Sequence, residues 1–236
     1  MSSSCIVIAT NRKYNQFIAN SLANELSARV ILISEEADLT YQNLSSINPD
    51  WVFVLHWSRI IPEEVYTNFR VVIFHMTDLP FGRGGSPLQN LILRGYEDTV
   101  ISAIQCVKEI DAGSVYLKER LNLNGTADEI LIRASKIIKK MIVKIVQENP
   151  TPFPQVGEVS VFKRRQPHQS KIDFHEVRTL EQFYDYIRML DGEGYPNAFV
   201  EVGNFRISFH SPHLRPSFVE SQVKIELIHE SEEDSQ

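Results

Sequence analysis

Four short apolar runs near the start of the chain constrain its fold more than any other feature of the sequence. They are Cys5–Ala9, Val30–Ser34, Trp51–Leu55 and Val71–Phe74, and polar turns and helical patterns follow them. Strands that alternate with helices in this way form a parallel sheet covered on both faces. The unbroken apolar character of the runs is typical of strands buried in such a sheet. We therefore predict an α/β fold for this part of the chain.

The segment that follows departs from this alternation. Thr99–Val107 and Ser114–Leu121 each predict a strand, and the tight turn at Asp111–Gly113 joins them into a hairpin beside the parallel sheet. Thr126–Gln147 then predicts a long helix, because it opens with the Thr and Glu pattern of a capping box and continues at helical spacing.

A proline-rich segment, Asn149–Pro154, interrupts all regular structure. We place a domain boundary there, between an N-terminal domain of residues 1–149 and a small C-terminal domain of residues 150–236. Within the second domain, Thr179–Leu190 predicts a short helix. Three further runs predict a small sheet: Phe199–Val202, Phe205–Phe209 and Val223–Ile228.

Composition narrows the classes of function. The net charge is −6 and no long basic stripe occurs, so we expect no nucleic-acid partner. Cys5 and Cys106 both lie in apolar runs, which indicates buried thiols in a reducing compartment. No run is long enough for a membrane span and the chain starts without a charged leader, so we expect a cytoplasmic protein. The histidines show no metal spacing, and we expect no metal.

The strongest candidate for chemistry is His75, directly after the run Val71–Phe74. Open α/β sheets bind ligands at the carboxyl ends of their strands, and an imidazole there can move a proton near neutrality. The Gly-rich turn Gly82–Gly85 follows and precedes a helical pattern from Pro87, an arrangement that can hold an anion. The alternatives are a structural histidine and a flexible connection.

Other candidates depend on where the fold places them. Asp111 is either an ordinary turn residue or, if its turn lies beside His75, a carboxylate that raises the basicity of the imidazole. Asn11, Arg12 and Lys13 follow the first strand, where they hold a phosphate or sugar or form a solvated turn. Trp57 follows the third strand and either packs in the core or stacks on a ligand ring.

Several segments resemble one family. HMTDLPFGRGGSP, from His75 to Pro87, is similar to the signature of formyltransferases that use N10-formyltetrahydrofolate. IDAG, at Ile110–Gly113, resembles that family's LDTG block, and HWSRIIPEEV, at His56–Val65, resembles its folate-side segment. YIRMLDGEGYPNAF, at Tyr186–Phe199, resembles its C-terminal region. The likeness covers most of the chain in the right order, and it is closest to the sugar-nucleotide N-formyltransferase branch.

The resemblance implies a fold and a set of roles. The fold is a Rossmann-like formyltransferase domain with a mixed, mainly parallel sheet, followed by a small, mostly β C-terminal domain. His75 is the general base and Asp111 its partner, while Asn11 and Thr77 are candidates for holding the formyl oxygen. The remaining residues contact the two substrates: Pro80, Phe81, Gly82, Arg83, Gly84 and Trp57 on the folate side, and Asn11, Arg12 and Lys13 on the diphosphate.

One departure concerns the family's Asn-x-His pattern, because Ile73 stands where the asparagine is expected. An isoleucine side chain donates no hydrogen bond, so we expect the donor to come from elsewhere. The run LPFGRGGSPLQNLI, at Leu79–Ile92, is most similar to enzymes of pseudaminic-type sugar synthesis. We therefore expect a nucleotide-linked aminosugar as acceptor and, by the same resemblance, a homodimer. The alternatives are a non-catalytic nucleotide-sugar or folate binder and a methionyl-tRNA formyltransferase.

Overall fold

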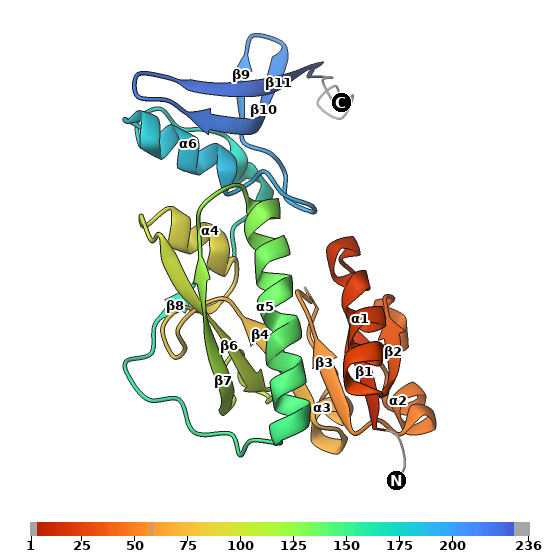
Figure 1. The fold of residues 1–236 in the computed structure, drawn as a ribbon. Coiled ribbons are helices and arrows are strands. Elements are labelled where there is room, and N and C mark those ends of the chain that lie inside the picture. The colour runs from red at the N-terminus through yellow and green to blue at the C-terminus, as the bar shows by residue number, and fades with distance from the viewer. Residues whose placement is uncertain (1–3, 58, 229–236) are drawn as a thin grey trace, which may run out of the picture. The chain divides into compact units, whose positions relative to one another are not determined.

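The structure is a computed structural model that describes residues 4–57 and 59–228. The chain divides into two compact units (Figure 1). Unit 1 comprises residues 1–87, 98–122 and 131–163, and unit 2 comprises residues 88–97, 123–130 and 164–236.

Unit 1 is built on a six-stranded sheet with the order β2-β1-β3-β4-β6-β7. Its strands are β1 (Cys5–Ala9), β2 (Arg29–Ile33), β3 (Trp51–Val54), β4 (Val71–His75), β6 (Asp98–Gln105) and β7 (Val115–Asn122). The first four strands of this order pair in parallel, β6 is antiparallel to β4, and β7 is antiparallel to β6. The predicted mixed, mainly parallel sheet with an added hairpin is confirmed.

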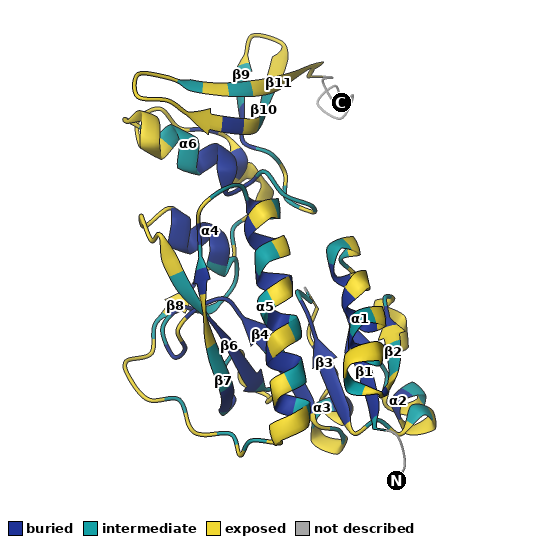
Figure 2. Ribbon diagram, in the orientation of Figure 1, coloured by how far each residue is buried: buried dark blue, intermediate teal, exposed yellow. Residues whose placement is uncertain are grey.

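Alternate residues of the central strands point to opposite faces of the sheet. On one face, Val7 and Val52 pack in a cluster with Leu44 of α2 (Tyr41–Ile47) and Val65 of α3 (Glu63–Asn68). Figure 1 shows α1 (Gln16–Leu26) and the later part of α5 (Ala127–Glu148) in front of the sheet. These two helices are joined by an ion pair of 2.6 Å between Lys139 and Glu25. The central strands β1 and β3 are buried throughout, as Figure 2 shows.

Unit 2 contains a three-stranded antiparallel sheet with the order β11-β10-β9. The strands are β9 (Phe199–Val202), β10 (Phe205–Leu214) and β11 (Val219–Leu227). Helix α6 (Leu180–Arg188) begins with a capping box at Thr179 and packs through Phe183, whose ring lies 5.6 Å from that of Phe209 on β10. The expected small, mostly β C-terminal domain is therefore present. A short helix, α4 (Pro87–Ile92), follows the Gly-rich turn.

The sequence did not predict one small pairing. Strand β5 (Arg83–Gly84), in the Gly-rich turn, pairs in parallel with β8 (Val161–Phe162). This pairing places residues 150–163 in compact unit 1, although they follow the proline-rich segment. The domain boundary that the sequence predicts between residues 149 and 150 stays a prediction.

Candidate functional site

His75 ends β4 and is buried, with 7% of its surface exposed. Its Nε2 lies 2.8 Å from the carbonyl oxygen of Gly82, and its Nδ1 lies 3.4 Å from Oδ2 of Asp111. A carbonyl oxygen and a carboxylate can only accept hydrogen bonds, so both ring nitrogens face acceptors.

The turn that carries Asp111 lies directly beside His75. Asp111 adopts a left-handed backbone with φ of 54°, and its Oδ2 accepts a hydrogen bond of 2.8 Å from the backbone N–H of Gly84. The carboxylate thus connects the imidazole with the Gly-rich turn. Nearby, burial and the charge of Asp111 raise the pKa of the Cys106 thiol to about 11, so this cysteine stays protonated and is a poor nucleophile.

Thr77 is fully buried two residues after His75. Its hydroxyl oxygen lies 3.4 Å from the same Gly82 carbonyl oxygen, and Ser102 donates a hydrogen bond of 2.8 Å to its backbone carbonyl. Two donors, the hydroxyl of Thr77 and Nε2 of His75, therefore converge on one carbonyl oxygen. Ile73, at the expected asparagine position, packs among apolar core residues instead.

Five of the six residues expected on the folate side, Pro80 to Gly84, form one loop over His75, whereas Trp57 lies outside it. Phe81 packs edge to face on Phe162 with ring centroids 5.3 Å apart, and the backbone of Pro80 accepts a hydrogen bond from Ser160. Gly82 donates its backbone N–H to Oγ of Ser160 at 2.8 Å. Arg83 and Gly84 form β5, so this loop is an ordered structure fixed on residues 160–162.

Sequence reasoning missed the residues that fix this loop. Gln155, Ser160 and Phe162 lie in or after the proline-rich segment, whose composition indicates only a linker. The guanidinium of Arg83 donates to Oε1 of Gln155 from two nitrogens, at 3.1 and 2.7 Å. No periodicity or motif in this segment could have revealed these contacts, because they join residues about 70 positions apart in the chain.

Asn11, Arg12 and Lys13 follow β1, and Trp57 follows β3. Because β3 lies between β1 and β4 in the sheet, the β1 end stands two strands from His75, roughly 10 Å away. Asn11 and Lys13 are exposed, and Trp57 packs against the core cluster of one sheet face. Their contacts with a substrate stay predictions.

A second histidine, His56, follows β3 and lies in a different environment. The amide nitrogen of Asn15 lies 3.1 Å from its Nδ1 and 3.0 Å from the hydroxyl of Thr10, and Ser135 donates to the amide oxygen of Asn15 at 2.6 Å. Burial and the nearby charge of Arg12 lower the pKa of His56 to about 4. His56 is therefore neutral at pH 7, and it accepts through Nδ1 and carries its proton on Nε2.

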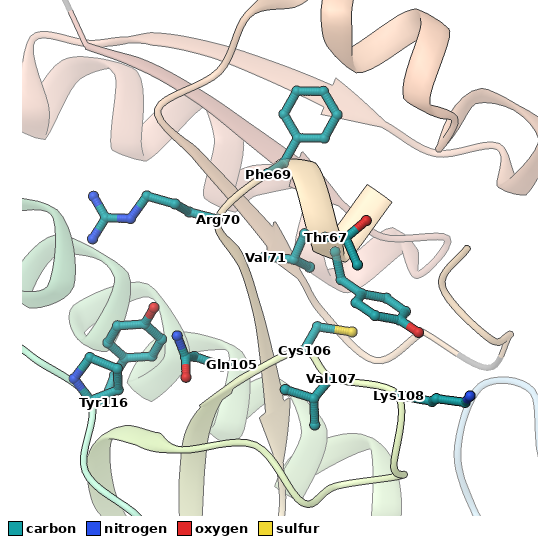
Figure 3. Close-up of a pocket in the computed structure, with 11 residues that line it drawn as sticks. Thr67, Phe69, Arg70, Val71, Gln105, Cys106, Val107, Lys108 and Tyr116 are labelled. Carbon is teal, nitrogen blue, oxygen red and sulfur yellow. The ribbon is translucent and has the colours of Figure 1, made fainter. Parts of the chain in front are cut away.

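An open cavity of about 490 Å³ lies at the opposite edge of the sheet, where β4 begins and β6 ends (Figure 3). Tyr66, Arg70 and Cys106 are among its lining residues, and neither His75 nor Asp111 is. Over residues 4–57 and 59–228, the structure shows no cluster of three or more residues suited to hold a metal ion. Within the same ranges, every helix is too short or too polar to cross a membrane.

Comparison with known proteins decides the family. Residues 9–146 match the family model described as formyl transferase. The chain belongs to the formyl transferase family. Residues 167–226 match a second model, described as the C-terminal domain of methionyl-tRNA formyltransferase. The expected enzyme class, an N-formyltransferase with a formyl-folate donor, is confirmed at the level of this family.

Among formyl transferases of known structure, one called methionyl-tRNA formyltransferase from Clostridium thermocellum is 45% identical, with a TM-score of 0.92. The match covers 95% of this chain and 99% of that one. A curated methionyl-tRNA formyltransferase from Sulfurihydrogenibium sp. is 26% identical over 169 residues, which are 68% of this chain and 53% of the relative. The chain thus spans about half the length of the curated relatives it matches.

These relatives correct two expectations. The expected nucleotide-linked aminosugar acceptor was wrong, because the 45% identical protein is a methionyl-tRNA formyltransferase. A likely sugar N-formyltransferase from Mycobacterium tuberculosis is only 14% identical, with a TM-score of 0.68 over 86% of this chain and 93% of that one. The residues from His75 to Pro87 are expected to surround the formyl group, which is common to both classes of reaction, so they do not identify the acceptor. The pseudaminic-type assignment from Leu79–Ile92 was wrong for the same reason.

The expectation of no nucleic-acid partner was also wrong, because the similar proteins are methionyl-tRNA formyltransferases. The net charge of −6 averages over the whole chain, whereas recognition of a particular RNA depends on local cations. Four of the acidic residues lie within residues 230–234, and four cations lie within residues 163–171.

Proposed function

We propose that this chain transfers a formyl group from N10-formyltetrahydrofolate to the amino group of methionyl-tRNA. One observation carries the proposal: the His75–Asp111 pair and its covering loop lie in a chain that is 45% identical to a methionyl-tRNA formyltransferase, over 95% of this chain and 99% of that one. The two free cysteines, Cys5 and Cys106, are in keeping with the reducing cytoplasm, where charged tRNA is found.

The donors around His75 fit a formyl group. The hydroxyl of Thr77 donates to the carbonyl oxygen of Gly82, as it would to a formyl oxygen. The acceptor amine attacks the formyl carbon of N10-formyltetrahydrofolate and the bond between that carbon and N10 breaks. N10 receives the proton that His75 has taken from the amine, and tetrahydrofolate leaves. Pro80, Phe81, Gly82, Arg83 and Gly84 form the ordered loop that would face it.

The chain's own residues then have separate tasks. Neutral His75 accepts the proton that the attacking amine loses, and Asp111 at Nδ1 stabilises the resulting imidazolium. Thr77 donates its hydroxyl to the developing oxyanion, in the role that an asparagine at position 73 would have had. Asn11 is the second candidate donor, and Arg12 and Lys13 are candidates for contact with RNA phosphates.

Cationic side chains in unit 2 support an RNA acceptor. A cavity of about 340 Å³ there has a rim of cationic, imidazole and amide groups, although Glu226 also lines it. Those groups belong to His168, Asn197, Arg206, His210 and Lys224. Arginine and lysine contact phosphate oxygens in most complexes with nucleic acids.

The test is an assay of the full chain with N10-formyltetrahydrofolate and methionyl-tRNA, followed by mass spectrometry of the aminoacyl group. Free methionine and an uncharged tRNA serve as acceptor controls. We expect formyl-methionyl-tRNA only in the complete reaction. Binding of the folate without any transfer would overturn the proposal in favour of a non-catalytic folate binder.

The oxyanion assignment has its own matched pair of variants. Thr77→Val removes the hydroxyl at nearly constant shape, and Thr77→Ser keeps it. We expect kcat to fall about 10²-fold in Thr77→Val, as for the loss of one oxyanion donor, and to stay near wild type in Thr77→Ser. Equal kcat values in the two variants would show that Thr77 is not the oxyanion donor, and Asn11 would be the next candidate.

A further inference from the structure

Gln155 is unusual within its own segment. Every other residue from 153 to 159 is exposed, whereas Gln155 is half-buried. Its Nε2 donates to the backbone carbonyls of Asp111 and Gly113, at 2.8 and 2.9 Å. Its Oε1 accepts the two hydrogen bonds from Arg83. A primary amide has two N–H donors and two acceptor sites, so its full hydrogen-bonding capacity is used.

The groups that Gln155 joins are the supports of His75. Asp111 provides the carboxylate at Nδ1, and Arg83 adjoins the residue whose carbonyl oxygen meets Nε2. The two supports come from different parts of unit 1, the turn between β6 and β7 and the loop after β4. One side chain therefore fixes the spacing between the two groups that hold the imidazole from opposite sides.

The turn requires such support. Asp111 has a positive φ of 54°, a conformation that a non-glycine residue keeps only where its surroundings hold it. The backbone carbonyls of the turn accept from Gln155, which satisfies them and fixes their direction. A change of this contact would move the carboxylate of Asp111 relative to His75.

We propose that Gln155 is a positioning residue for formyl transfer, which holds the turn of Asp111 and the loop at Arg83 in place around His75. This inference rests on the proposed function, because it assigns a residue to the same site. It extends that site to the segment after the proline-rich stretch, from which neither motif nor charge predicted a contribution.

Gln155→Glu is the most informative variant. It keeps the shape of the side chain and the acceptor for Arg83, but it replaces both N–H donors by an oxygen that faces two carbonyl oxygens. Val156→Ala is the matched control, because Val156 is the next residue and is 87% exposed. We expect kcat to fall about 10²-fold in Gln155→Glu, as for a catalytic group displaced by about 1 Å, and to stay at the wild-type value in Val156→Ala.

A double-mutant cycle with Asp111→Asn separates positioning from general stability. If Gln155 acts through Asp111, the variant with both changes has the kcat of Asp111→Asn alone. If the two losses multiply, Gln155 does not act through Asp111 and the proposal is overturned. Gln155→Asn keeps the amide group but is one methylene shorter. We expect its kcat to be nearly as low as that of Gln155→Glu, because the shorter side chain cannot contact both Asp111 and Arg83.

The His75 ring also provides a readout without any substrate. NMR of the ring nitrogens over a pH series should show a changed His75 titration in Gln155→Glu and a wild-type titration in Val156→Ala. An unchanged His75 titration in folded Gln155→Glu would overturn the positioning role. Since this measurement requires no formyl transfer, it remains decisive even if the wild-type chain fails to formylate methionyl-tRNA.

Discussion

His75 ends β4 and His56 follows β3, the adjacent parallel strand, yet different kinds of groups surround the two imidazoles. His75 faces two hydrogen-bond acceptors, the carboxylate of Asp111 and the carbonyl of Gly82. His56 faces the amide donor of Asn15 and is buried near Arg12, so its pKa is lowered to about 4. Both histidines come at or after the end of a strand, so this position does not single out the candidate base. The neighbouring groups do: acceptors surround His75, whereas a donor and a nearby cation surround His56.

The largest expected effect concerns this division of roles. His75→Ala removes the proposed general base and should lower kcat roughly 10²–10⁴-fold with formyl-folate and methionyl-tRNA. His56→Asn should keep the wild-type kcat at pH 7, since asparagine tolerates the positive φ of 49° at this position. Steady-state kinetics of both variants check this prediction. A comparable loss in His56→Asn would abolish the distinction.

The second prediction concerns acid stability. The unfolded chain protonates His56 near pH 6.5, but the folded chain does so only near pH 4. Between these values the unfolded state binds more protons, so the free energy of unfolding falls as the pH is lowered, by about 3 kcal/mol from this residue. Urea unfolding at pH 7 and pH 4.5 should show a smaller loss in His56→Asn. His213→Asn, at an exposed position, should lose as much as wild type.

The third prediction tests how tightly the loop covers His75. A Cβ at Gly84 would lie 2.5 Å from the carbonyl oxygen of Phe162, whereas one at Gly95 would meet no atom within 4 Å. Both glycines have positive φ, so the pair isolates the clash from backbone strain. Gly84→Ala should lose about 2 kcal/mol more stability than Gly95→Ala, as for an overpacked core position. Thermal unfolding of both variants measures this difference, and equal losses would mean that the loop is loosely held.

The smallest expected effect lies in the His56 network. Ser135→Ala leaves the amide oxygen of buried Asn15 without its 2.6 Å donor, which should cost about 1 kcal/mol in the free energy of unfolding. Formyl transfer should be unaffected, because the network surrounds the histidine that is not proposed to act. Urea titration and a rate assay give both numbers, and a large loss of rate without loss of stability would link His56 to the reaction.

The sequence predicted much of this arrangement, because local patterns encode it. Apolar runs such as Trp51–Leu55 indicated strands close to their observed bounds, and the motif from His75 to Pro87 indicated the family. Proximity of Asp111 to His75 was only conditional in the sequence, since it depends on the hairpin of β6 and β7. The role of Gln155 could not be predicted, because a glutamine directly after a proline-rich segment carries no periodic signal.

The acceptor also escaped prediction, for a related reason. Residues that hold a formyl group need not differ between an amine on a sugar and an amine on an aminoacyl ester. The motif around His75 therefore does not identify the acceptor. Net charge was a poor substitute, because it sums groups that stand far apart in the chain. Similarity over the whole length, 45% with the Clostridium thermocellum protein, carries the information that the local motif lacks.

The pairing of β5 with β8 has a practical consequence for protein engineering. A shortened chain that stopped at the proline-rich segment would retain both His75 and Asp111. It would lose β8, the strand that pairs with β5 in the loop over His75. Chimaeras that exchange C-terminal portions between relatives should therefore be joined after Lys163, so that the recipient keeps its own matching edge.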